Sequence, residues 1–405
     1  MTTLTEATRQ LELLMPYLDA GERTTVAGRL ARHLDAWPAL IADARQLLAD
    51  NEPADGERAK GLARRWSDLF SACYHGGDQQ LAAKIHRAFA AESALAMRPG
   101  LDSALFDYVQ DALQHLFSPY RSLDTSSAPK PSAFMVAVHR AVHRLIDLPL
   151  VFDDPLALTI LGREEADALR ANLDDYRNPY SSGLRASLSV RSRLAEEARE
   201  AAEQRGVHQY VILGAGLDTF AYRCEPHPQS RVFEVDLPAT QDWKRRQLAQ
   251  CAIAEPAHVC YVPVCFERES VIDALERSGF DRQAPAVFAW LGVTYYLEPA
   301  AVLRMLDMIG GLAAGSEVVF DYQPAPHCVG PFERRIMAGM AERLAARGEM
   351  LRSAFDPQEL AAHLGAAGFS VMEDFDADML NRRYLSGRQD GMSLAGVSRI
   401  MHARV

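Results

Sequence analysis

The chain has 405 residues, of which 48% are apolar, so it is long enough for about two or three domains and can bury a sizeable core. It carries 43 lysines and arginines against 54 aspartates and glutamates, and this balance of −11 disfavours sequence-independent binding to a nucleic-acid backbone. No apolar run approaches the roughly 18 residues that a membrane-spanning helix needs, so no membrane partner is expected.

The six cysteines show no C-x-x-C pair, and the N-terminus shows no secretory signal pattern. We therefore expect reduced thiols in a cytoplasmic protein. The histidines and cysteines also lack the spacing that is typical of metal ligands, so no metal site is predicted.

Residues 1–118 are expected to form an all-helical domain. Apolar residues recur at three-to-four spacing between Leu30 and Leu47, which is the pattern of a helix with one buried face. A second helix is expected over about residues 59–74, where two glycines follow as a stop signal, and a last one over residues 104–117.

Residues 119–131 lie within the string SPYRSLDTSSAPKPS, which is rich in serine and proline and has little to bury. We place a linker there, followed by a second domain over residues 132–405. In that domain strand-like apolar runs alternate with helix-like stretches, which is typical of right-handed βαβ units and a parallel, doubly wound sheet. The expected strands are 209–213, 231–236, 260–264, 286–291 and 317–322, with two more near 369–373 and 396–403.

The string VILGAGLDT, residues 211–219, joins the first expected strand to the next turn. Gly214 and Gly216 suit a sharp turn and leave room for a bound nucleoside. A dinucleotide site would place a third glycine where Thr219 stands. The neighbouring Asp218 carboxylate is a poor neighbour for a pyrophosphate and suits a cationic ligand better.

Asp236 ends the next expected strand, twenty residues after Gly216. A carboxylate there can accept hydrogen bonds from two ribose hydroxyls. S-adenosyl-L-methionine (AdoMet) carries an ammonium, a sulfonium and a ribose, and it fits this loop better than NAD does. For the loop and Asp236 alone, the alternative is a flavodoxin-like domain with a structural turn.

Four sequence blocks after residue 130 carry a family resemblance. They are SAFMVAVHRAVHRLIDLPLVFDDPLA (132–157), VILGAGLDTFAYR with VFEVDLPATQDWK (211–244), FAWLGVTYYLE (288–298) and RRYLSGRQDG (382–391). Together they resemble the leucine carboxyl methyltransferase family of class I AdoMet-dependent enzymes. The resemblance implies a Rossmann-like, doubly wound, mostly parallel seven-stranded sheet.

The resemblance also implies a set of cofactor-binding residues. Arg191 would pair with the AdoMet carboxylate, although without the resemblance a solvated helix arginine would be the favoured interpretation. Leu291 would follow the fourth strand beside the methyl group. The expected AdoMet contacts are Arg191, Gly214, Ala215, Gly216, Asp218, Asp236, Leu237, Cys265, Phe266 and Leu291.

One departure from the family pattern lies after the third expected strand. Val264-Cys265-Phe266 stands where the family usually has Val-Asp-Phe, whose aspartate accepts a hydrogen bond from the adenine amino group. A thiol is a weak acceptor, so adenine recognition would rest on backbone groups or on Glu267. We expect AdoMet binding weaker than is usual in the family, and we expect Cys265→Asp to tighten it.

Residues 1–118 are a second departure, because the family core does not need them. The string from Trp66 to Asp78 resembles, more faintly, the helical drug-binding domain of MerR-type regulators. No winged-helix pattern or basic patch accompanies it, so DNA binding is not implied. The alternative is a generic helical bundle that packs on the catalytic domain.

Methyl transfer needs an acceptor held in line with the carbon–sulfur bond. A carboxylate acceptor is already ionised and needs only positioning donors, for which Tyr296, Arg223 and Arg383 are the candidates. A hydroxyl acceptor would need a base, and His139 and His327 are the imaginable ones, without an assigned role.

Substrate selection is expected to fall to two insertions, residues 147–190 and 324–355, which would form a lid. With the N-terminal bundle they would enclose an apolar acceptor pocket, so deletion of residues 1–118 is expected to keep AdoMet binding and abolish turnover. The sequence thus predicts an AdoMet-dependent O-methyltransferase that acts on a carboxylate or hydroxyl of a small molecule in secondary metabolism. The alternatives are a protein or peptide carboxyl methyltransferase and a ligand-binding regulator without turnover.

Overall fold

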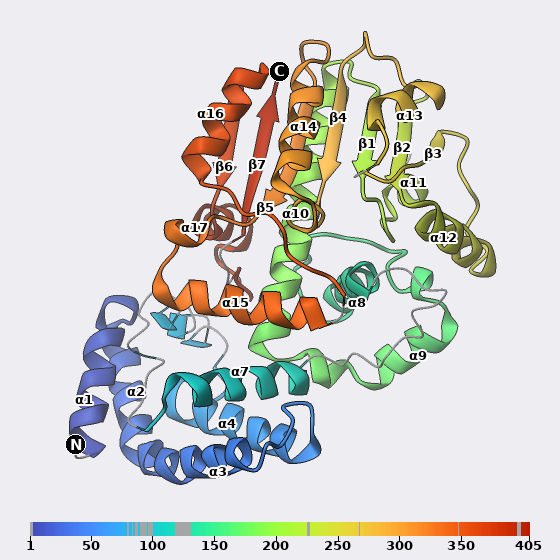
Figure 1. Ribbon diagram of the computed structural model, residues 1–405. Helices are drawn as coiled ribbons and strands as arrows, with labels where there is room; N and C mark the ends of the chain where they lie inside the picture. The colour runs from blue at the N-terminus through green and yellow to red at the C-terminus, as the bar shows by residue number, and fades with distance from the viewer. Residues whose placement is uncertain are drawn as a thin grey trace.

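The computed structural model contains a helical bundle and an α/β unit (Figure 1). The bundle lies below the sheet in that view, and helix α15 (Pro331–Ala346) lies between them. The expected linker lies almost wholly outside the described residues, so the domain boundary stays a prediction. The structure describes residues 3–78, 81–82, 84–85, 88–89, 95, 100–117, 131–224, 227–266, 268–346, 348–394 and 398–405.

The N-terminal bundle is all-helical among its described residues, as expected. Its elements are α1 (Thr3–Leu14), η1 (Met15–Tyr17), α2 (Ala20–His33), η2 (Leu34–Ala36), α3 (Trp37–Ala49), α4 (Glu57–Tyr74) and α7 (Ser103–Phe117). The stripe from Leu30 to Leu47, however, is divided between the end of α2, η2 and α3 and is not one helix. Their apolar faces meet in one core, where the rings of Trp37 and Trp66 pack edge to face with centroids 4.9 Å apart. The Trp37 indole N–H lies 3.3 Å from the Cys73 sulfur, which gives this buried donor a partner.

The α/β unit begins with helices and continues into a seven-stranded sheet. Before the first strand come α8 (Pro131–Ile146), η3 (Thr159–Leu161), α9 (Arg163–Ala171), η4 (Leu173–Tyr176) and α10 (Pro179–Gln204). The strands are β1 (Gln209–Leu213), β2 (Arg231–Asp236), β3 (Val259–Pro263), β4 (Ala286–Trp290), β5 (Glu317–Tyr322), β6 (Val371–Phe375) and β7 (Arg399–Arg404). Between them lie α11 (Phe220–Arg223), α12 (Pro238–Gln250), α13 (Val271–Arg277), η5 (Thr294–Tyr296), α14 (Pro299–Gly310), η6 (Pro326–Cys328), α15, α16 (Pro357–Ala367), α17 (Ala377–Leu380) and the π-helical turn η7 (Asn381–Leu385).

The strand order is β3-β2-β1-β4-β5-β7-β6. Strands β1 to β5 pair in parallel, and β7 pairs antiparallel with both β5 and β6. This topology confirms the Rossmann-like, mostly parallel sheet expected from the sequence. Because β2 and β4 flank β1 on opposite sides, the strand order reverses there, and such a reversal opens a crevice at the carboxyl ends of the strands.

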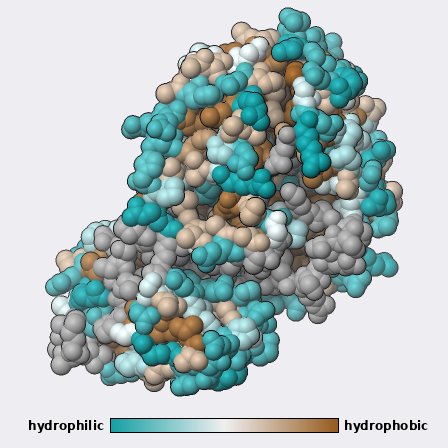
Figure 2. Space-filling model, viewed as in Figure 1, coloured by the Kyte–Doolittle hydropathy of each residue, from teal (hydrophilic) through white to brown (hydrophobic). Residues whose placement is uncertain are grey.

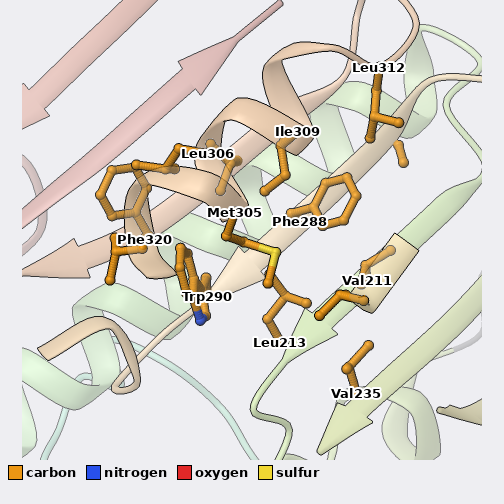
Figure 3. Packing of buried hydrophobic residues seen from close by; sticks show 14 of the residues in the cluster. Val211, Leu213, Val235, Phe288, Trp290, Met305, Leu306, Ile309, Leu312 and Phe320 are labelled. Carbon is orange, nitrogen blue, oxygen red and sulfur yellow. The ribbon is translucent and has the colours of Figure 1, made fainter. Parts of the chain in front are cut away.

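Helices cover both faces of the sheet, as parallel strands require. Strand β4 is buried along its whole length. On one face its Phe288 and Trp290 pack with Met305 and Ile309 of α14 (Figure 3). Each large apolar side chain buried in this way stabilises the fold by about 1.5–3 kcal/mol. The strand ends that carry the site are therefore firmly anchored.

Hydrophilic side chains cover much of the face shown in Figure 2, with smaller apolar areas between them. The exposed large apolar side chains include Met15, Leu148 and Met350, which are far apart in the sequence. Within the part of the chain that the structure describes, no helix combines the length and the apolar character needed to cross a membrane.

Candidate active site

A cavity of about 550 Å³ opens at the carboxyl ends of the parallel strands. The turns after β1 and β4 both line it, so it lies where the strand order reverses. Its volume falls in the range of about 300–1,000 Å³ that is usual for small-molecule pockets. All of the expected AdoMet contacts line it, namely Arg191, Gly214, Ala215, Gly216, Asp218, Asp236, Leu237, Cys265, Phe266 and Leu291.

The glycine loop after β1 has a backbone that other residues would adopt only with strain. Gly214 has φ +71° and Gly216 has φ +47°, both in the left-handed region. A Cβ added at Gly214 would lie 2.4 Å from the Cγ2 of Val293, in the turn after β4. The amides of Gly214 and Ala215 donate to the Val235 carbonyl of β2 at 2.7 and 3.1 Å. The two turns that flank the crevice therefore pack directly against each other.

Asp236, the last residue of β2, faces the loop across the crevice. Its carboxylate oxygens accept hydrogen bonds from the amides of Gly216 at 2.6 Å and of Leu237 at 2.7 Å. Burial raises the pKa of Asp236, and these two amide bonds oppose the rise. Asp236 is also hydrogen-bonded to the Thr240 side chain, and because a carboxylate has about four acceptor sites, it keeps capacity for a ribose hydroxyl. The chemistry of this residue thus fits the sugar of a nucleoside.

A buried network of ion pairs and hydrogen bonds packs against the glycine loop. The Arg140 guanidinium of α8 donates to the Leu217 carbonyl at 2.6 Å and lies 3.4 Å from Asp218 and 3.5 Å from Asp154. The Thr219 hydroxyl donates to the other Asp154 oxygen at 2.7 Å. The sequence motifs VHRAVHR and VFDDP therefore serve the loop, a role that the sequence alone did not reveal, because these residues lie some 65 to 78 positions from their partners.

Asp218 is the acidic residue that faces the cavity from this network. Burial alone would raise the pKa of Asp218, but the nearby Arg140 and Arg223 hold it below the ordinary value. The side chain is therefore ionised at neutral pH. An anion here suits the cationic groups of AdoMet, as the sequence indicated.

Arg191 of α10 lines the cavity from the opposite side. Its guanidinium donates to Asp321 of β5 at 2.7 Å and is also hydrogen-bonded to Tyr295. Asp321 in turn accepts from the Gly292 amide at 2.6 Å. A guanidinium has five N–H donors, so Arg191 keeps donors for the carboxylate that the family resemblance assigns to it.

The wall after β3 contains Cys265 and Phe266. The Cys265 amide donates to the carboxylate of Glu269 at 2.8 Å, a contact that sequence reasoning did not anticipate. Glu267, the other residue considered for adenine recognition, lies outside the described residues. The expectation of weaker AdoMet binding stays a prediction.

Of the three candidates for positioning the acceptor, the structure brings only Tyr296 to the cavity among its described lining residues. Arg223 lies behind the glycine loop, where it pairs with Glu196 and donates to the Thr219 hydroxyl at 3.2 Å. Arg383 is exposed on η7 and lies 3.3 Å from Glu197. Both arginines pair with carboxylates and neither is among the residues that line the cavity, so their role in positioning the acceptor stays a prediction that this geometry does not support.

The two histidines considered as bases also lie elsewhere. His139 is buried, with its ring 3.0 Å from the Met135 carbonyl, and burial lowers its pKa to about 4. His327 is exposed and lies 3.0 Å from Asp356. Its neighbour Cys328 also contacts Asp356, which lies 28 positions later, so potential ligand atoms of these three residues lie within 4.8 Å of one another, outside the cavity lining.

Segments outside the strand ends line another part of the cavity, which we call its second end; at the start of α8 it reaches the glycine loop, because the Ala133 Cβ would lie 3.3 Å from a Cβ added at Gly216. It is lined by Met340 and Leu344 of α15, by residues 348–352, by the start of α8 and by His115 of α7. This arrangement fits the expected lid of residues 324–355 and its partnership with the bundle. Among the described residues of the other expected lid, 147–190, those that line the cavity are Leu184, Ser187 and Leu188.

Glu349 lies at this second end, and sequence reasoning missed it. Its side chain is buried, and it accepts a hydrogen bond from the Ser132 hydroxyl at 2.9 Å. Tyr295 and Tyr296 are near enough for its charge to affect their pKa values. No motif contains Glu349, so only the three-dimensional contacts identify it.

Comparison with known proteins agrees with this geometry. The sequence profile described as leucine carboxyl methyltransferase matches residues 133–310. A Mycobacterium ulcerans protein named as an S-adenosyl-L-methionine-dependent methyltransferase is 31% identical over 284 residues, with 67% of this chain and 79% of that protein covered. YktD of Bacillus subtilis, which has the same kind of name, is 29% identical over 299 residues, with 67% and 96% covered. A solved structure from Thermobifida fusca, described as a methyltransferase, is 19% identical, with 71% of this chain and 98% of that one covered and a TM-score of 0.42.

The matched profile begins inside α8 and includes the glycine loop, Asp236 and η5. The N-terminal bundle precedes it, which agrees with the expectation that the family core does not need residues 1–118. The chain belongs to the leucine carboxyl methyltransferase family and is an AdoMet-dependent methyltransferase.

Proposed function

We propose that this methyltransferase acts on a carboxylate or hydroxyl oxygen of a small molecule. The observation that carries the proposal is the cavity, which is lined by the glycine loop and, at its second end, by Met340 and Leu344 of α15. Helix α7 of the bundle also contributes to the lining there, through His115. A compartment covered by two such elements suits a small molecule better than the terminus of a folded protein.

AdoMet, when bound, supplies a methyl group on a sulfonium, and the chain holds the reactants in line. In this proposal Asp236 accepts hydrogen bonds from the ribose, and Arg191 pairs with the amino-acid carboxylate. Met340 and Leu344 keep water from the second end, which strengthens the polar interactions made there. We place the reaction in secondary metabolism and in the cytoplasm, and the six unpaired cysteines support the latter.

The test is transfer of label from methyl-tritiated AdoMet to an extract of bacterial metabolites and, separately, to an extract of bacterial proteins. Label is expected in the metabolite fraction, and the Asp236→Ala variant is expected to lose it. Label in a protein band would favour the alternative of a protein carboxyl methyltransferase. Binding of AdoMet without transfer to either extract would contradict the proposal and favour a regulator.

A further inference from the structure

The inference concerns the acceptor and rests on the proposed function. It starts from Glu349, whose side chain is only 7% exposed at the second end of the cavity. The Ser132 hydroxyl donates to it at 2.9 Å, and the Ser132 amide lies 3.5 Å away. Among the described residues no lysine or arginine forms an ion pair with it. A buried carboxylate with so few partners has acceptor sites left for a ligand.

The other acids that line the cavity are all held by partners. Asp218 lies beside Arg140, and Asp321 accepts from Arg191. Glu196 pairs with Arg223 behind the loop. Asp236 accepts two backbone amides. Glu349 differs from the three acids paired with arginines, because its hydrogen-bond partner among the described residues is the neutral Ser132, and it differs from Asp236, whose backbone partners belong to the glycine loop and the turn after β2.

Other titratable groups that line the cavity lie at the same end, among them Tyr296, His115 and Arg352. The Tyr296 hydroxyl is hydrogen-bonded to Ser132, and burial, with the charges of Tyr295 and Glu349, raises the pKa of Tyr296 above its ordinary value. Tyr296 therefore keeps its proton at neutral pH and acts as a donor. His115 lies 3.8 Å from Asp111 on the same helix α7. The Arg352 guanidinium, on the same segment as Glu349, donates to Glu298 at 3.2 Å.

We infer that Glu349 is the general base of this enzyme and that the acceptor is a hydroxyl compound. A hydroxyl can donate its proton to the Glu349 carboxylate, which then has a second hydrogen-bonded partner. A carboxylate acceptor would instead place a second anion beside Glu349 in a buried site, which is unfavourable. Tyr296 and Ser132 orient the acceptor oxygen and the Glu349 carboxylate oxygen.

The step balances as a proton transfer coupled to a substitution. The hydroxyl proton moves to a Glu349 oxygen while the acceptor oxygen forms its bond to the methyl carbon. The carbon–sulfur bond breaks, and its electron pair stays on sulfur, which becomes a neutral thioether. The proton on Glu349 is afterwards lost to water. A positioned base of this kind typically accelerates a reaction about 10²- to 10⁴-fold.

The experiment uses the full chain, methyl-tritiated AdoMet and an extract of bacterial metabolites. The labelled products are treated with alkali, which hydrolyses methyl esters to volatile methanol and leaves methyl ethers intact, and mass spectrometry identifies the ethers. The inference expects alkali-stable ethers. It also expects Glu349→Gln to lower their rate of formation by about 100-fold or more and to abolish its rise with pH.

Glu359→Gln is the matched control, because Glu359 is exposed on α16 and does not line the cavity. It is expected to leave rate and pH profile unchanged. Both variants are expected to bind S-adenosylhomocysteine as the wild type does, which shows that they are folded.

Volatile label would overturn the hydroxyl acceptor and leave the proposed function standing. Stable ethers formed equally fast by Glu349→Gln would overturn the base. No labelled metabolite at all, from protein that binds S-adenosylhomocysteine, would overturn the proposed function and this inference with it.

Discussion

The two ends of the cavity are built in different ways. At the cofactor end, the residues come from the ends of adjacent strands and are held by backbone amides and by the Arg140–Asp218–Asp154 network. At the second end, where we place the acceptor, the lining comes from α7, α8, α15 and residues 348–352, which are far apart in the sequence. There the Ser132 hydroxyl and amide, both neutral donors, contact Glu349.

This difference shows how one scaffold can keep its cofactor and change its acceptor. The network behind the glycine loop couples several residues, so replacing one member leaves charges buried without partners. The acceptor end depends on segments added to the sheet, and its residues can change with little effect on the strands. The predictions that follow test this contrast.

The largest effect is expected from Arg140→Met. Arg140 is almost fully buried, and its removal leaves Asp154 and Asp218 with only one of the two arginines that they share. Breaking a buried pair in this way costs about 3–5 kcal/mol of unfolding free energy, measurable by denaturant titration. Arg144→Met is the control one turn later, because its pair with Asp153 is exposed, and exposed pairs contribute about 0–1 kcal/mol. Equal losses in the two variants would contradict the network.

A slightly smaller effect is expected for His139 of α8. The sequence offered this residue as a possible base, and the structure buries it outside the cavity lining. Its pKa is lowered from 6.5 to about 4 by burial. As the pH falls, the unfolded chain therefore binds a proton at this ring at a higher pH than the folded chain does. The free energy of unfolding then decreases between about pH 6.5 and pH 4. This loss is about 3 kcal/mol. His139→Gln should show a correspondingly weaker pH dependence of unfolding, and an unchanged dependence would refute the assignment.

The third effect is on cofactor binding at the glycine loop. Gly214→Ala adds a Cβ that would lie 2.4 Å from Val293, in a backbone with φ +71°. Such strain costs about 1–3 kcal/mol, so affinity for S-adenosylhomocysteine is expected to fall about 10- to 100-fold in calorimetry. Gly28→Ala is the control, because Gly28 lies within α2 with open space around it. Unchanged affinity in Gly214→Ala would mean that the loop can move freely.

Much of the fold could be predicted from the sequence, because it depends on local patterns. Alternating apolar runs and the string from Val211 to Thr219 identified the sheet, the crevice and the cofactor-lining residues. The string RRYLSGRQDG lies in a family block, yet the structure leaves its Arg383 at the surface. Motif membership alone therefore does not indicate proximity to a reacting group.

The residues that sequence reasoning missed depend on long-range contacts. Asp154 and Thr219 meet across 65 positions, and Ser132 and Glu349 across 217. No spacing rule spans such distances. Glu349 also follows α15 in an insertion without a motif, so its burial beside two tyrosines could be learned only from the structure.

The smallest effect is expected from Cys265→Asp, at the wall where this chain departs from its family. A carboxylate in place of the weakly accepting thiol should add one hydrogen bond to the adenine amino group, worth about 0.5–1.5 kcal/mol, or up to about tenfold in affinity. Glu269 complicates this gain, because its carboxylate already binds the Cys265 amide at 2.8 Å and would lie close to a new negative charge.

Cys265→Asn separates the effect of the new hydrogen bond from that of repulsion by Glu269, because its side chain offers a carbonyl acceptor without a charge. If the hydrogen bond governs affinity, both variants bind S-adenosylhomocysteine more tightly than the wild type. If repulsion from Glu269 governs it, only Cys265→Asn gains, and lowering the pH should then recover binding in Cys265→Asp. A loss in both variants would mean that adenine does not lie against this wall, and the alignment of Cys265 with the family aspartate would be wrong.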